Sequence, residues 1–219
     1  MILVFGTPRS GTTAISNYLE GYNEPFNKWM LDFDDTPFRR RILNLPLDQA
    51  LERLKGKYRV IKEVSVIFDH TSPLPLIHHP LIDKHLFCVR ANIFNQALSL
   101  CISIKLKKWH GDKDFVRNSS IGEIDEDLFR YQLDYLKKTN NRIKEICKQV
   151  KGKLCVFEDL FESQDSRKYW HSLSLYTKIL FSEEKFAQVN SVRYNDDRTR
   201  SSIDNFERLK KIYESFNNR

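Results

Sequence analysis

A short N-terminal stretch places the strongest constraint on what this chain can fold into. Residues 2–5 are four consecutive apolar residues, and they run directly into Gly6 and Gly11, two glycines five positions apart. Hydroxyl side chains follow at Thr12 and Thr13, and apolar residues then recur at helical spacing. The pattern predicts a buried strand, a glycine loop (residues 6–13) and a helix. This arrangement directs backbone N–H groups at an anion.

The loop matches the nucleotide-binding pattern G-x-x-x-x-G-K-[ST] with one departure. Thr12 stands where the pattern has a lysine. In nucleoside triphosphate sites that lysine contacts the β- and γ-phosphates, and an acidic residue at a strand end helps to hold magnesium. The strand predicted nearest to that second role, residues 86–89, ends in Arg90 instead. Both differences favour an anionic nucleotide that is bound without a metal ion.

Apolar stretches and helical patterns alternate along the rest of the chain. Beyond the first strand, short apolar runs predict strands over residues 58–62, 86–89 and 154–157. Helices are predicted over residues 46–54, 92–108 and 169–180, after a cap at Asp125, and after a polar loop over residues 190–202. This alternation predicts an α/β fold, a three-layer sandwich with a mainly parallel central sheet, in one domain over residues 1–219.

The carboxyl ends of the predicted strands carry the main candidate functional residues. Ligands of parallel α/β sheets bind beyond those ends. This chain has the glycine loop, Lys62, Glu63, Arg90 and an acidic pair at residues 158–159 in these positions. We therefore expect the functional site at this edge of the sheet.

Composition and charge narrow the class of partner. The chain has 36 Lys and Arg against 29 Asp and Glu, a formal net charge of +7, which suits an anionic partner. The basic residues are spread along the chain, so nucleic-acid binding rests on net charge alone and is not expected. No stretch approaches the roughly 20 apolar residues of a membrane helix. Because the first strand begins at residue 2, we expect no signal peptide and a soluble, cytoplasmic protein.

The four cysteines form no C-x-x-C pair and no Cys/His spacing typical of a metal site. Cys88 and Cys155 lie within apolar runs that are predicted to be strands. We therefore expect buried free thiols and no metal ion.

Residues 6–13 read Gly-Thr-Pro-Arg-Ser-Gly-Thr-Thr and resemble the 5′-phosphosulfate loop of sulfotransferases that use 3′-phosphoadenosine 5′-phosphosulfate (PAPS). In that family a Lys or Arg directly precedes Ser-Gly and contacts the bridging or leaving phosphate oxygens. The resemblance implies this role for Arg9, and a P-loop-type α/β fold. It implies the following cofactor-binding residues in the loop: Pro8, Arg9, Ser10, Gly11, Thr12 and Thr13.

Two further segments resemble parts of the same family. An Arg at a strand end and a Ser in the next helix grip the 3′-phosphate there, which implies these roles for Arg90 and Ser99. Their spacing is one residue longer than usual, and the common Asp/Asn-Pro after the Arg is absent. Residues 96–100 still look like those of bacterial carbohydrate sulfotransferases. Residues 199–207 resemble the C-terminal segment that folds over the cofactor, which implies that Arg200 also binds it.

The resemblance also implies candidate catalytic residues. Arg9 would stabilise the leaving phosphate, and Lys62 would stabilise the sulfuryl group during transfer. Val64 stands where cytosolic hormone-type and phenol-type sulfotransferases have a catalytic histidine, so a carboxylate is the expected base. Glu24, in a segment similar to the family's G-E-P-[FL], is the first candidate, and Glu63 is the second.

We therefore expect a sulfotransferase that moves a sulfuryl group from PAPS to a hydroxyl or amine of a carbohydrate or small metabolite. The spent product would be adenosine 3′,5′-bisphosphate (PAP), and no metal would be required. A P-loop kinase for a small molecule is one alternative, although Thr12 replaces the lysine that it needs. A nucleotide-binding module without catalysis is another.

Overall fold

The fold is built on a parallel β-sheet. The computed structural model describes residues 1–23, 36–64, 74–107, 120–190 and 200–218. Within them, a five-stranded sheet has the order β2-β3-β1-β4-β5, and every pair of neighbouring strands is parallel. The strands are β1 (Ile2–Gly6), β2 (Tyr22–Asn23), β3 (Val60–Val64), β4 (Lys84–Val89) and β5 (Lys153–Val156).

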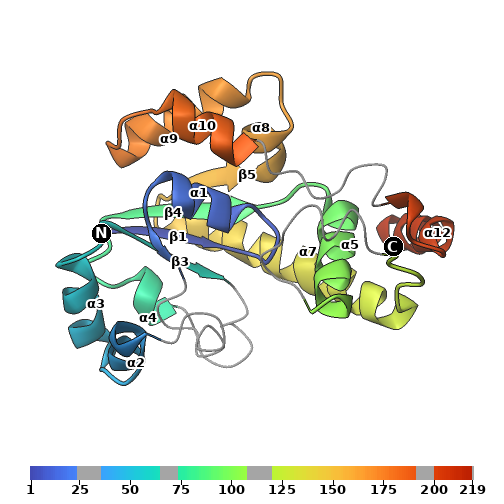
Figure 1. The fold of residues 1–219 in the computed structure, drawn as a ribbon, viewed down its shortest axis with the longest axis horizontal. Coiled ribbons are helices and arrows are strands. Elements are labelled where there is room, and N and C mark those ends of the chain that lie inside the picture. The colour runs from blue at the N-terminus through green and yellow to red at the C-terminus, as the bar shows by residue number, and fades with distance from the viewer. Residues whose placement is uncertain (24–35, 65–73, 108–119, 191–199, 219) are drawn as a thin grey trace.

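Helices flank the sheet on both faces, which confirms the predicted α/β sandwich (Figure 1). They are α1 (Thr12–Tyr18), α2 (Pro37–Leu43), α3 (Leu47–Lys55), α4 (Leu74–Ile77), α5 (Ile93–Lys105), α7 (Glu126–Gln149), α8 (Phe157–Phe161), α9 (Ser166–Thr177), α10 (Glu183–Asn190) and α12 (Phe206–Asn217). Among the residues described, none of these helices combines the length and apolar character needed to cross a bilayer.

The two faces of the sheet bury separate apolar clusters. Val4 and its neighbours pack under α1, α8 and α9, whereas Phe5 and its neighbours pack against α2–α4 and the C-terminal half of α7. This division follows from the strand geometry, because successive side chains point to opposite faces. A third cluster joins α5, the N-terminal half of α7 and α12. It lies beside the carboxyl ends of the strands (Figure 1).

The structure corrects some predicted boundaries. Phe157, predicted as the last residue of a strand, instead begins α8 directly after β5. The sequence analysis also missed β2, because two residues carry no legible alternation, and the short helices α2, α4 and α10. The polar loop predicted over residues 190–202 falls largely outside the described residues, since only Asn190 and residues 200–202 are described.

The predicted cap of the longest helix is present. Asp125 Oδ1 accepts a hydrogen bond of 2.9 Å from the backbone N–H of Leu128, as an N-cap carboxylate should. This bond satisfies one of the N–H groups that have no partner within the first turn of a helix.

Replacing this cap should destabilise the fold by a small, defined amount. We expect Asp125→Ala to lower the free energy of unfolding by about 1 kcal/mol. Asp125→Asn, which keeps an acceptor oxygen, should lower it by much less. Urea unfolding followed by circular dichroism would measure both variants, and an equal loss in the two would contradict a capping role.

Candidate functional site

The glycine loop joins β1 to α1 at the carboxyl edge of the sheet. A Cβ atom on Gly6 would lie 2.5 Å from the backbone oxygen of Cys88 on the neighbouring strand, so only glycine fits there. Gly11 has a φ of 84°, and a Cβ atom on it would lie 2.7 Å from the ring of Phe161. Because the two glycines have no Cβ atom, the loop can pass close to β4 at Gly6 and close to α8 at Gly11. As a result, the N-terminal end of α1 lies at the carboxyl edge of the sheet.

Arg9 occupies a constrained position within the loop. Its φ of 63° lies in the left-handed region, which is uncommon for residues other than glycine. Its Nε donates a 2.9 Å hydrogen bond to Oγ of Ser99, which is on α5 and only 5% exposed. The structure thus brings together two residues that lie 90 positions apart and that the sequence analysis assigned to phosphate groups.

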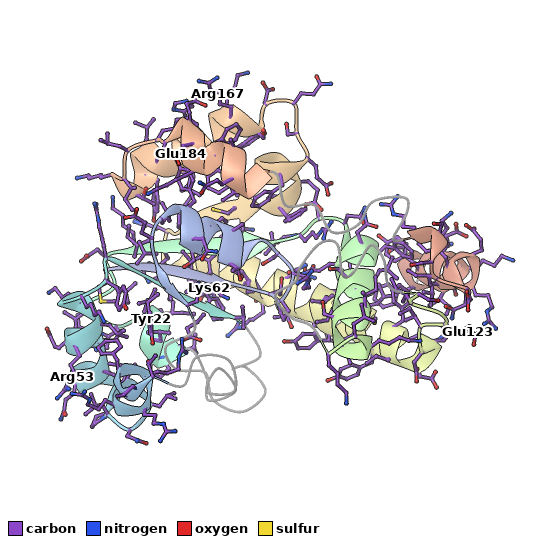
Figure 2. All side chains as sticks on the ribbon, viewed as in Figure 1. Tyr22, Arg53, Lys62, Glu123, Arg167 and Glu184 are labelled. Atoms are coloured by element: carbon purple, nitrogen blue, oxygen red, sulfur yellow. The ribbon has the colours of Figure 1, made fainter. Side chains whose placement is uncertain are left out.

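Lys62 and Glu63 end up on opposite faces of β3. Lys62, labelled in Figure 2, is 1% exposed, and its Nζ donates a 3.0 Å hydrogen bond to Oγ1 of Thr13 at the start of α1. Glu63 pairs in register with Phe5 and is fully buried on the other face. The structure therefore brings Lys62, but not Glu63, to the glycine loop.

Arg90 is engaged by two carboxylates. Its Nη2 lies 3.3 Å from Oε1 of Glu162, and its Nε lies 3.5 Å from Oε1 of Glu158. The guanidinium also covers the ring of Phe157, with Cζ 4.1 Å from the centroid. Burial lowers the pKa of Arg90 from its usual value, and the two carboxylates oppose that shift. In this structure, the partners described for the Arg90 guanidinium belong to the segment that follows β5.

Glu158 connects this ion pair to the start of α5. Its two carboxylate oxygens accept hydrogen bonds of 2.8 and 2.9 Å from the backbone N–H groups of Ala91 and Asn92. A carboxylate is favourable at a helix N-terminus, where backbone donors lack partners. Glu158 thereby fixes the turn between β4 and the helix that carries Ser99.

Three buried polar residues at the base of the loop were not singled out in the sequence analysis. Thr7, Gln96 of α5 and Asn140 of α7 hydrogen-bond to one another, and each is at most 2% exposed. A signal was available. Gln96 and Asn140 stand at helix positions where the spacing calls for an apolar side chain, which marks a polar group that needs a buried partner.

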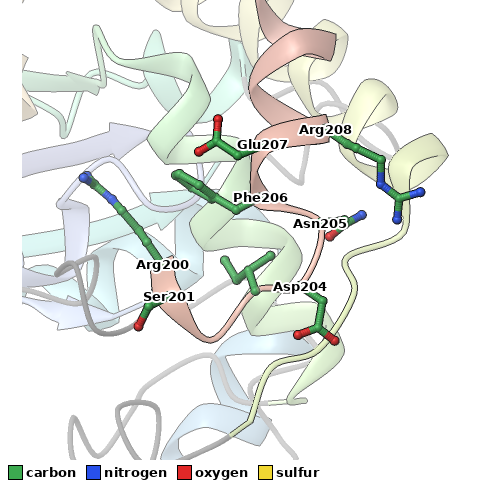
Figure 3. Close-up of a pocket in the computed structure, with 8 residues that line it drawn as sticks. Arg200, Ser201, Asp204, Asn205, Phe206, Glu207 and Arg208 are labelled. Atoms are coloured by element: carbon green, nitrogen blue, oxygen red, sulfur yellow. The ribbon is translucent and has the colours of Figure 1, made fainter.

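Arg200 begins the C-terminal segment that precedes α12. This segment is held by Gly122, which exchanges backbone hydrogen bonds with Ser202 and Asp204, and by Asn205, whose side chain bonds the N–H and carbonyl of Ile124. Residues 200–201 and 203–208 border a cavity of about 300 Å³ (Figure 3). Arg200 and Arg208 point to opposite sides of the segment in this view.

The remaining predicted catalytic residue, Glu24, lies outside the described residues. In the part of the chain that the structure describes, no group of three or more His, Cys, Asp or Glu side chains could hold a metal ion. The described contacts of the glycine loop include two cations that each lie next to a hydroxyl group. Arg9 with Ser99 stands on one side, and Lys62 with Thr13 on the other. Such a set can bind an anion.

The cysteines are free and buried, as predicted. Burial raises the pKa of Cys101 to about 12 and raises the pKa of Cys88 well above its usual value. A thiol whose pKa is raised stays protonated at neutral and mildly alkaline pH, and the protonated form is not a nucleophile.

We expect the native protein to react very slowly with a thiol reagent such as dithionitrobenzoate at about pH 8. Both burial and the raised pKa keep the reactive thiolate scarce. Unfolding in guanidinium should expose all four thiols and provides the reference count. Fast reaction of any thiol in the folded protein would contradict this description.

No known family model matches this chain, and no curated protein matches it either. The functional assignment therefore depends on the residues gathered at the carboxyl edge of the sheet and on their chemistry.

Proposed function

We propose that this chain is a sulfotransferase that uses PAPS as its sulfuryl donor. One observation carries the proposal, the 2.9 Å hydrogen bond between Arg9 Nε and Ser99 Oγ. The resemblance implies that Arg9 contacts the 5′-phosphosulfate and that Ser99 contacts the 3′-phosphate of the same nucleotide. Their direct contact puts both residues within reach of one ligand, which supports a single nucleotide bisphosphate site, and a chance similarity of two distant segments would not require it.

The contact of Lys62 with Thr13 also supports a site that works without a metal ion. In the nucleoside triphosphate pattern, the hydroxyl at this loop position holds magnesium. Here an ammonium group lies 3.0 Å from that hydroxyl. A cation so close to Thr13 Oγ1 disfavours a second cation on the same oxygen. This arrangement therefore favours an anionic group that Lys62 can contact directly.

The proposed reaction sets out what each side chain has to do. PAPS supplies a sulfuryl group that passes to an acceptor oxygen or nitrogen, while the acceptor loses a proton and PAP remains. Arg9 would stabilise the charge that develops on the leaving phosphate, because a guanidinium stays charged and can donate two parallel hydrogen bonds. Lys62 would stabilise charge on the group in transfer, and its burial strengthens that effect.

The acceptor proton needs a base within hydrogen-bond reach. We retain Glu24 as the first candidate, because in the sequence it directly follows Asn23, the residue of β2 that pairs in register with Lys62 of β3. Glu63 is the weaker candidate, since it is buried on the face of β3 opposite Thr13. A carbohydrate or a small metabolite is the proposed acceptor.

The proposal predicts which nucleotide binds. PAP should bind at least about tenfold more tightly than Mg-ATP, because Ser99 lies next to Arg9 and is the candidate for a second phosphate, whereas the loop lysine of a triphosphate site is replaced by Thr12. Isothermal titration of the purified protein with each ligand would measure this. Tighter binding of Mg-ATP would instead favour the small-molecule kinase.

The proposal also predicts that the Arg9 side chain is essential for transfer. Arg9→Ala and Arg9→Gly should each lower kcat about 10²–10³-fold, as expected for losing one charged donor to the leaving group. The glycine variant matters because glycine adopts a φ of 63° without strain, so its loss of activity reports the missing guanidinium.

Turnover of labelled PAPS with a panel of glycans, phenols and lipids would measure these variants. Arg130→Ala, at an exposed position on α7, removes the same charge away from the loop and serves as the control. Near-normal transfer by Arg9→Gly would rule out the proposed role. Tight PAP binding with no turnover on any acceptor would favour a binding module without catalysis.

A further inference from the structure

The base of the glycine loop contains a closed ring of hydrogen bonds. The Thr7 hydroxyl donates to Asn140 Oδ1 at 2.9 Å, Asn140 Nδ2 donates to Gln96 Oε1 at 3.1 Å, and Gln96 Nε2 donates to Thr7 Oγ1 at 2.7 Å. Each residue gives one bond to the next and receives one from the last. Hydrogen bonds arranged in one direction around a ring polarise one another and strengthen the whole set.

We infer that Asn140 is a positioning residue that fixes the glycine loop for anion binding. The inference rests on the proposed function only in taking the loop as the anion site. Asn140 itself belongs to α7 and contacts the loop through Thr7 and Gln96. It therefore acts on bound ligand through other residues.

The ring leaves none of its amide hydrogens unused. Each of the two amide groups has one hydrogen in the ring and a second that bonds a backbone carbonyl. Gln96 Nε2 donates to the Pro8 carbonyl at 2.7 Å, and Asn140 Nδ2 donates to the Arg90 carbonyl at 3.1 Å. A fully satisfied buried network specifies one arrangement, because any rearrangement leaves a buried polar group without a partner.

The carbonyl groups of Pro8 and Arg90 show which parts of the backbone the ring holds in place. The Pro8 carbonyl belongs to the peptide group that precedes Arg9. The hydrogen bond from Gln96 therefore holds the plane of this peptide group, and the φ of 63° at Arg9 is measured from that plane. Thr7 also accepts, through its own carbonyl, a 2.7 Å bond from Ser10 Oγ. The bond to the Arg90 carbonyl ties the same unit to the end of β4.

This geometry explains how a non-glycine residue keeps a left-handed conformation in the loop. Such a conformation persists only where the surroundings over-determine it. Gln96 holds the peptide group before Arg9, and Ser99, three residues further along α5, holds its side chain. Asn140 keeps Gln96 oriented by occupying its carbonyl oxygen. Replacing Asn140 should therefore increase the mobility of the glycine loop without removing any residue that contacts the ligand directly.

The test compares two adjacent asparagines on α7. Asn140→Ala should weaken PAP binding at least about tenfold, equivalent to about 1.4 kcal/mol. Hydrogen exchange of the amides at residues 9–13 should accelerate in this variant, with little change in the central strands. Asn141→Ala, at the exposed neighbouring position, should behave as the unmodified protein in both measurements.

A second pair of variants guards against a simple loss of fold in Asn140→Ala. Thr7→Val keeps the shape of the side chain but removes the hydroxyl that closes the ring, and it should accelerate exchange of the same loop amides. Thr7→Ser keeps the hydroxyl, and its loop amides should exchange more slowly than those of Thr7→Val.

The outcomes separate this inference from the proposed function. Uniform acceleration of exchange across the sheet, with unchanged PAP affinity in Asn140→Ala, would reduce Asn140 to a general structural residue and overturn the inference. If the unmodified protein does not bind PAP, the proposed function fails. The inference then stands or falls on whether the loop amides alone accelerate in Asn140→Ala and Thr7→Val.

Discussion

The close approach at the carboxyl end of β1 is the constraint on which the rest of the site depends. Gly6 leaves no room for a side chain, because a Cβ atom would meet both Cys88 and the Thr12 methyl group at less than 3.0 Å. The chain must therefore turn immediately after the strand, with α1 close above β4. Once this turn is fixed, the loop residues can only face the carboxyl edge. That edge is also where parallel sheets of this class bind ligands.

The cations at this edge differ in what surrounds them. Arg90 is held between Glu158 and Glu162, and Glu158 also accepts hydrogen bonds from the backbone N–H groups of Ala91 and Asn92, directly before α5. Arg9 and Lys62 contact hydroxyl groups in the interactions described here. Arg9 and Lys62 are the two cations whose described contacts lie at the glycine loop, and the proposed function assigns the anion to them.

Much of the fold could be predicted because its signals are local. The four longer strands contain short apolar runs, and the cap at Asp125 and the glycine loop are short motifs that can be recognised from neighbouring residues. The start of α8 at Phe157 was missed since an aromatic residue after an apolar run suits a strand or a helix equally well. The two residues of β2 pair with β3 through backbone contacts that leave no periodic pattern.

The sequence by itself determined the alternation of the longer strands and helices, the glycine loop after the first strand and the burial of the thiols, because each follows from composition or periodicity over a few residues. Only the tertiary structure decided which charged groups meet. Packing of α5 and α7 against the end of β1 brings Ser99 to Arg9 and Asn140 to Thr7, across 90 and 133 positions of sequence. Packing likewise decided which face of β3 meets the start of α1, so that Lys62 and not Glu63 contacts Thr13. Such contacts depend on how distant elements dock, and no local pattern encodes that docking.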